Sequence, residues 1–267
     1  MNYIQIIIYF ILKPYKALRV SFCFAFIFIS GVSLADVSLN EINTYIKEGK
    51  YLEASNQALS LKNVDGYFLA ADSLLLYGFC SAPISEQTNV YKDAWNAAQL
   101  AYDLLIKENE KDKIILSHAH ILLANTMGRY SQSIGVVKAL REGFAGRIEN
   151  ELDLALKYDP ENYRAHLSKG SWHAEIVKAA GFMAGPLYGA EEELARDHYL
   201  TAIQYAPDRE PSILYESARG LSLIDEKDDI ALMHKLLKES VNYVPNTHMD
   251  QCYINLSKIL IDEVTNQ

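Results

Sequence analysis

The segment from His166 to Glu175 carries the side chains best suited to chemistry. His166, Gly170 and His173 follow one another at spacings of four and three residues, so they share one face of a helix. Trp172 and Glu175 lie beside that face. One interpretation is a packed helical hairpin with a tryptophan core and hydrogen-bonded histidines; the other is the polar lining of a groove. Catalysis by His173 with Glu175 ranks below both, because residues two apart on a helix point apart.

A second candidate site follows Gly128. We expect a break between helices at Gly128–Ser131, which would place Arg129 and Tyr130 at the turn of a hairpin. A guanidinium group matches the geometry of a carboxylate, so Arg129 with Tyr130 would suit a carboxylate-bearing ligand. A purely structural role for both side chains is the alternative.

Motifs typical of enzymes and metal sites are absent from the sequence. It contains no Walker loop, no nucleophile elbow, no Cys-x-x-Cys and no His-Glu-x-x-His. His118 and His120 are two residues apart, so on a helix they point roughly 200° apart and are poorly placed to share a metal. We therefore expect no catalytic residue, no metal and no cofactor, and an enzyme is the third possibility after two kinds of binding protein.

Composition and charge favour a folded, acidic protein. Half of the 267 residues are hydrophobic and the formal net charge is -9. Such a composition is ordinary for a globular chain. A net negative surface repels phosphate backbones, so we expect no nucleic-acid partner.

The N-terminal residues resemble an export signal. Lys13, Lys16 and Arg19 precede an apolar stretch, and Ser33-Leu34-Ala35 offers the small residues that signal peptidase accepts. We predict a signal peptide over 1–35, with an uncleaved N-terminal anchor as the alternative and the only expected membrane contact. The protein is then exported and periplasmic, or anchored at the membrane by its N-terminus.

The rest of the chain has the pattern of successive helices. Breaks are predicted at Gly49, 63–66, 82–83, 109–113, 128–131, 159–160, 181–189, 207–211, 225–229 and 245–246. Apolar residues between them recur every three or four positions, and we find no strand-like alternation. Short turns between such segments are typical of antiparallel helical hairpins.

One spacing recurs in several of these segments. Ala195, Tyr199, Ala202 and Pro207 follow the second-helix pattern of a tetratricopeptide repeat, in which small residues let helices approach and proline ends the hairpin. The same register fits Ile148, Leu152, Ala155 and Pro160, then Met233, Leu237, Ser240 and Pro245, and more weakly Ala98, Tyr102 and Leu105. We therefore predict an all-α fold: a single solenoid domain of degenerate tetratricopeptide-like hairpins over 36–267.

A glycine-rich insertion interrupts the repeats at 181–189. It combines three glycines with large apolar residues such as Phe182 and Tyr188, so we expect it to pack back onto the helices. Insertions in repeat arrays usually fall on one face, which is often the binding face. Gly170, in mid-helix, is expected to permit a close contact between helices.

Two cysteines, Cys80 and Cys252, follow the predicted signal. An oxidising compartment would allow them to pair. They lie near opposite ends of the mature chain, however, and a regular solenoid keeps its ends apart. We therefore predict two separate buried thiols.

The stretch from Gly128 to Gly220 resembles a family of exported bacterial tetratricopeptide-repeat proteins without an established activity. The resemblance rests on Gly-Arg-Tyr-Ser at 128–131, Phe-Ala-Gly-Arg at 144–147, His166 with Gly170, Trp-His-Ala-Glu-Ile-Val at 172–177, Leu-Tyr-Gly-Ala at 187–190 and Ala-Pro-Asp at 206–208. A looser similarity is to the T component of tripartite periplasmic transporters. That family is typically anchored by a lipid-bearing cysteine, which this signal lacks, and no binding residue is carried over from it.

These patterns predict a non-catalytic interaction module that binds a protein or peptide. The alternative is a small-ligand or transporter-accessory protein, with a pocket between the 166–175 helix and the 181–189 insertion. The candidate binding residues are Arg129, Tyr130, His166, Trp172, His173, Glu175 and Tyr188.

Overall fold

A computed structural model describes residues 38–224 and 229–265 of the chain. The predicted signal segment, 1–35, lies outside these residues. The described residues belong to one compact unit, 36–267, and their regular structure is entirely helical, as predicted. None of the described helices is both long enough and apolar enough to cross a membrane.

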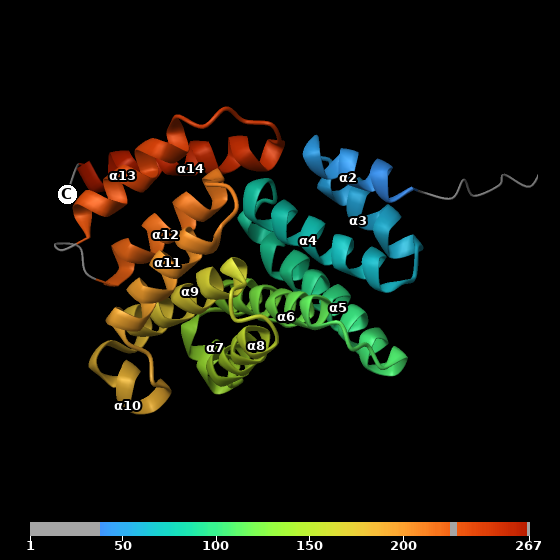
Figure 1. Cartoon of the computed structure of the whole chain (residues 1–267), viewed down its shortest axis with the longest axis horizontal. Helices are drawn as coiled ribbons and strands as arrows, with labels where there is room; N and C mark the ends of the chain where they lie inside the picture. The colour runs from blue at the N-terminus through green and yellow to red at the C-terminus, as the bar shows by residue number, and fades with distance from the viewer. Residues whose placement is uncertain (1–37, 225–228, 266–267) are drawn as a thin grey trace, which may run out of the picture. The chain divides into compact units, whose positions relative to one another are not determined.

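Helices form successive packed pairs, in which each second helix lies against the first helix that precedes it (Figure 1). The first helices are α2 (Leu39–Lys47), α4 (Val64–Cys80), α6 (Lys113–Ile134), α9 (Tyr163–Ala180), α12 (Pro211–Ile224) and α14 (His248–Thr265). The second helices are α3 (Tyr51–Ser60), α5 (Ile84–Glu108), α8 (Phe144–Tyr158), α11 (Glu192–Tyr205) and α13 (Ile230–Val241). Shorter elements are α7 (Val136–Arg141), η1 (Gly181–Met183) and α10 (Ala184–Tyr188).

Several first helices begin at a side chain that accepts a backbone N–H. The N-cap residues of α2, α4, α6 and α9 are, in order, Ser38, Asn63, Asp112 and Asn162. These caps satisfy N–H groups that a helix leaves without an internal partner, so the sequence fixes where these helices start.

Small and apolar residues of the predicted repeat register lie where the helices pack. Ala195, Tyr199 and Ala202 are fully buried in α11, and Leu152 with Ala155 is equally buried in α8. Met233, Leu237 and Ser240 are buried in α13, and prolines 160, 207 and 245 each follow the end of a second helix.

The first helices also contact one another in order, from α2 to α14, and α14 returns to contact α2 and α4 (Figure 1). Side-chain hydrogen bonds between α6 and α9 show that these two helices run parallel. Asn162 bonds Ser117, Ser168 bonds Asn125, and Gln132 bonds Glu175, so the partners stay 43 to 45 residues apart along both helices.

One predicted break is wrong. α6 continues through Gly128–Ser131 to Ile134, so Arg129 and Tyr130 lie within a helix and not at a turn. Ser131 donates its hydroxyl to the Gly128 carbonyl, a bond that a helix accommodates, and the glycine has open space around it. The predicted break at 225–229 falls mostly outside the described residues, and α13 begins at Ile230.

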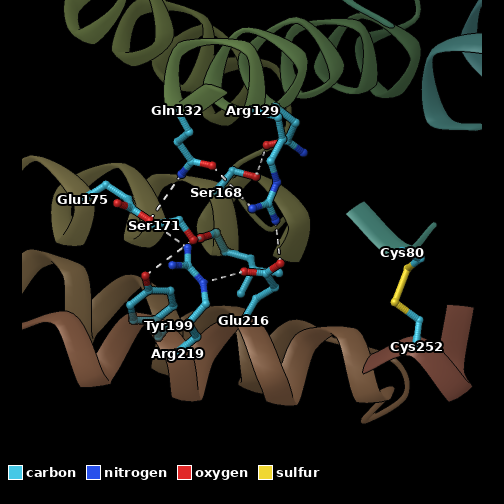
Figure 2. Close-up of polar contacts among 12 residues, drawn as sticks. Cys80, Arg129, Gln132, Ser168, Ser171, Glu175, Tyr199, Glu216, Arg219 and Cys252 are labelled. Atoms are coloured by element: carbon cyan, nitrogen blue, oxygen red, sulfur yellow. Dashed lines mark hydrogen bonds and ion pairs between the residues drawn. A yellow bond between two sulfur atoms is a disulfide. The ribbon is translucent and has the colours of Figure 1, made fainter. Parts of the chain in front are cut away.

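The expected separation of Cys80 and Cys252 is also wrong. The two residues form a disulfide with a Cα–Cα distance of 5.9 Å, which joins α4 to α14 (Figure 2). Beside it, the Tyr51 hydroxyl lies 3.1 Å from His248 Nδ1, which brings α3 to the start of α14. The cysteines meet because the path of the helices brings the last described helix back to the early ones.

Removing this disulfide with Cys80→Ser/Cys252→Ser should lower the free energy of unfolding by about 2–5 kcal/mol, because the bond closes a loop of 172 residues. Urea unfolding followed by circular dichroism measures the change, with the wild-type protein under reducing conditions as a matched comparison. Two titratable thiols in oxidised, unfolded wild-type protein would contradict the pairing.

Candidate functional site

A cavity of about 580 Å³ lies among the first helices. Its wall is formed by side chains from α2, α4, α6, α9, α12 and α14, together with α7 and the start of α8. Most of these side chains are apolar, including Leu69, Phe79, Ile121, Leu152 and Trp172. Ligand sites in proteins are commonly of this size and are apolar with few polar groups. We call this space the central cavity.

Charged side chains from three first helices meet at one part of the central cavity (Figure 2). The carboxylate of Glu216 on α12 accepts a bond of 2.7 Å from Arg129 Nη2 on α6 and a longer one, 3.4 Å, from Arg219 Nε. Arg219 Nη2 also donates to Glu175 Oε1 on α9 at 2.8 Å. Gln132 Nε2 donates to the same Glu175 oxygen at 3.2 Å.

This ion network is balanced in charge, with two guanidinium groups and two carboxylates. Burial alone would raise the pKa of Glu216, but Arg129 and Arg219 outweigh it and hold that pKa below its ordinary value. Burial would lower the pKa of Arg219, yet Glu216 and Glu175 raise it. The Arg129 guanidinium also lies 4.4 Å from the ring centre of Phe79, which adds a cation–π contact to α4.

Three of the sequence-predicted binding residues, Arg129, Trp172 and Glu175, line the central cavity. The Trp172 side chain is buried, and its Nε1 donates to the Ala145 carbonyl at 2.9 Å. Tyr130 is not part of the cavity wall and packs against Trp95 and Phe144.

His166 and His173 lie elsewhere, against α11. There they meet His198, which the sequence analysis did not single out. His166 Nε2 lies 2.9 Å from the Pro160 carbonyl, so it must donate. His166 Nδ1 lies 2.9 Å from His198 Nδ1, and it accepts from His198 when His166 is neutral. His173 Nδ1 accepts the backbone N–H of Glu191 at 3.3 Å.

The 181–189 insertion packs onto α9, as expected. Ala184 and Tyr188 belong to an apolar cluster with Trp172 and Leu152, whereas Phe182 and Leu187 remain exposed. None of the residues 181–189 lines the central cavity, which is formed by the first helices.

The sequence analysis also missed Glu216 and Arg219. They are the only charged residues in α12, an otherwise uncharged helix. An isolated pair of opposite charges three residues apart in such a helix is a signal that would have found them.

No known family matches this chain, and no curated protein does. Within the residues described, no group of three or more histidine, cysteine or acidic side chains has an arrangement suited to a metal ion. The site is therefore interpreted from its own geometry.

The histidine contacts predict a pH dependence of stability. Burial lowers the pKa of both His173 and His198 to about 4, and the neighbouring Lys169 and histidines add to the effect. In the unfolded chain both would take up protons near pH 6.5. The unfolded state then binds more protons between these values, so the free energy of unfolding should fall as pH decreases from 6.5 towards 4.

Between pH 7 and pH 5 the combined loss for the two histidines should be on the order of 2 kcal/mol, because solvent screening reduces the effect of each, and urea unfolding at both pH values measures it. His173→Gln/His198→Gln keeps hydrogen-bonding groups but cannot titrate, so it should flatten this dependence. A wild-type stability that is equal at pH 7 and pH 5 would contradict the assignment.

Proposed function

We propose that this chain is a non-catalytic binding protein that holds a small, mainly apolar ligand in the central cavity. The observation that carries the proposal is the cavity itself, about 580 Å³ of space among helices that are otherwise closely packed. The apolar lining of this cavity is accessible to water, so a ligand of matching shape would remove apolar surface from water when it binds.

The surrounding fold is proposed to be a solenoid of degenerate tetratricopeptide-like repeats, exported by the segment 1–35. Its support is the burial of the repeat positions in α8, α11 and α13, and the parallel offset between α6 and α9. The similarity to transporter T components fits the same proposal, since such an accessory protein would need a site for a solute.

Gly128 permits a direct test, because it lines the central cavity and a Cβ atom there would meet nothing within 4 Å. A Cβ atom therefore fits at this position, and Gly128→Phe should place a ring in the cavity. Native mass spectrometry of wild-type protein, purified from the periplasm of the cells that make it, should show a retained small-molecule mass. That mass should be lost from Gly128→Phe.

The matched control is Gly146→Phe on α8. Gly146 also has open space around it but is not part of the central cavity wall. It should retain the ligand mass. A clean apo mass for the wild-type protein, or equal retention by Gly128→Phe, would contradict a ligand in this cavity.

A protein or peptide partner is the second candidate, and α7 favours it. Val136 and Leu140 line the cavity and are also 54% and 37% exposed, and Val137 beside them is 83% exposed. The cavity therefore has an exposed apolar border, which suits an apolar side chain of a partner.

A photo-crosslinking residue at Val137 tests this second candidate. It should yield one defined polypeptide adduct in the periplasm. The control position is Val244, which is 77% exposed and lies between α13 and α14. The same adduct from both positions, or none from Val137, would contradict a partner at α7.

A further inference from the structure

A second polar part of the central cavity is formed around Asp72 on α4. Asp72 lines the cavity with Leu69, Leu75 and Leu76 of the same helix, and 39% of its side chain remains exposed. Among the described residues, no side chain or backbone group forms a hydrogen bond with its carboxylate. His118 Nε2 lies 4.0 Å away and forms an ion pair with Asp72 only when His118 is protonated.

Four carboxylates but only three guanidinium groups line the cavity. Arg129 and Arg219 are matched by Glu216 and Glu175 in the ion network. The remaining charged groups are Asp72, Glu210 and Arg164, a surplus of one negative charge when His118 is neutral.

Arg164 does not neutralise Asp72 directly. Its Nε donates to the Tyr163 hydroxyl at 3.0 Å, and no carboxylate of the described residues forms an ion pair with it within 4.0 Å. Burial raises the pKa of Asp72, although Arg164, and His118 when it is protonated, oppose that effect.

The two polar parts of the cavity are far apart. His118 and Gln132 both line it and are 14 residues apart on α6, which corresponds to about 21 Å at 1.5 Å per residue. Ile121, Leu122 and Ala124 lie between them on the cavity wall, and they are followed by Asn125, which already accepts a hydrogen bond from Ser168. A long molecule with an apolar body therefore fits this lining better than a compact polar one.

We infer that the ligand of the central cavity is an amphipathic cation, a molecule with an apolar body and an ammonium group that lies at Asp72. This inference rests on the proposed ligand-binding function. An ammonium group would offset the surplus negative charge of the lining and donate hydrogen bonds to the part of the Asp72 carboxylate that faces the cavity. An anionic head would be repelled by Asp72 and Glu210 and attracted only by Arg164, and the guanidinium groups at the other end are already bonded to Glu216 and Glu175.

Three probes with the same ten-carbon alkyl chain test the inference: decylammonium, 1-decanol and decanoate. Each is titrated into the full protein at pH 7.5, and calorimetry measures its affinity. Decylammonium should bind roughly tenfold more tightly than 1-decanol, and decanoate should bind most weakly. Asp72→Asn should remove the difference between decylammonium and 1-decanol and leave the affinity for 1-decanol within about twofold. Asp93→Asn on α5 is the matched control, since Asp93 is exposed and is not part of the cavity wall.

The outcomes separate this inference from the proposed function. If decanoate binds with an affinity equal to or higher than that of decylammonium, the ligand is not an amphipathic cation, but the ligand-binding function stays in place. The same conclusion follows if folded Asp72→Asn still binds decylammonium more tightly than 1-decanol. Failure of all three probes to bind would overturn both. A thermal unfolding transition of Asp72→Asn that matches the wild-type transition establishes that the variant is folded.

Discussion

A partly buried carboxylate between two guanidinium groups links three of the first helices. Burial alone would raise the pKa of Glu216, and Arg129 and Arg219 outweigh that effect. Arg129 and Arg219 are paired with Glu216 in turn, and Glu175 completes the balance from α9. A shift of α6, α9 or α12 would break these pairs and leave a charge of the network without its partner, which is costly where water is excluded.

The same helices are packed closely beside the network. Tyr199 of α11 is fully buried, and a Cβ atom at Gly220 would lie 1.9 Å from its hydroxyl oxygen. A Cβ atom at Gly170 would lie 3.0 Å from the same ring. As Figure 2 shows, the Tyr199 hydroxyl points towards Ser171, to which it donates at 3.4 Å. The two glycines make room for the Tyr199 ring between α9 and α12. Beside it, the ion network links the same two helices through Glu175 and Arg219.

The contacts of α14 with α2 and α4 affect the shape of the space that the first helices surround. An open array of such helices presents a groove suited to an extended peptide. Here the Cys80–Cys252 disulfide joins α14 to α4, and Phe79 and Tyr253, next to the cysteines in the sequence, form part of the cavity wall on that side. This is the physical reason for placing a small ligand ahead of a peptide, although both proposals use the same residues.

The sequence by itself determined the helices and much of their burial. Capping residues such as Asn63 and Asn162 set helix starts, and the spacing of Ala195, Tyr199 and Ala202 identified a buried face, because both signals are local. Local signals also misled at Gly128, where a glycine with open space around it does not end a helix. Only the tertiary structure decided that Cys80 meets Cys252 and that Arg129 and Glu175 share an ion network with Glu216 and Arg219. It also decided that three of the predicted site residues line a cavity, whereas His166 and His173 belong to a histidine cluster. These outcomes depend on which residues far apart in the chain come together. Helical spacing places a side chain on a face, but the packing of all the helices decides what that face meets.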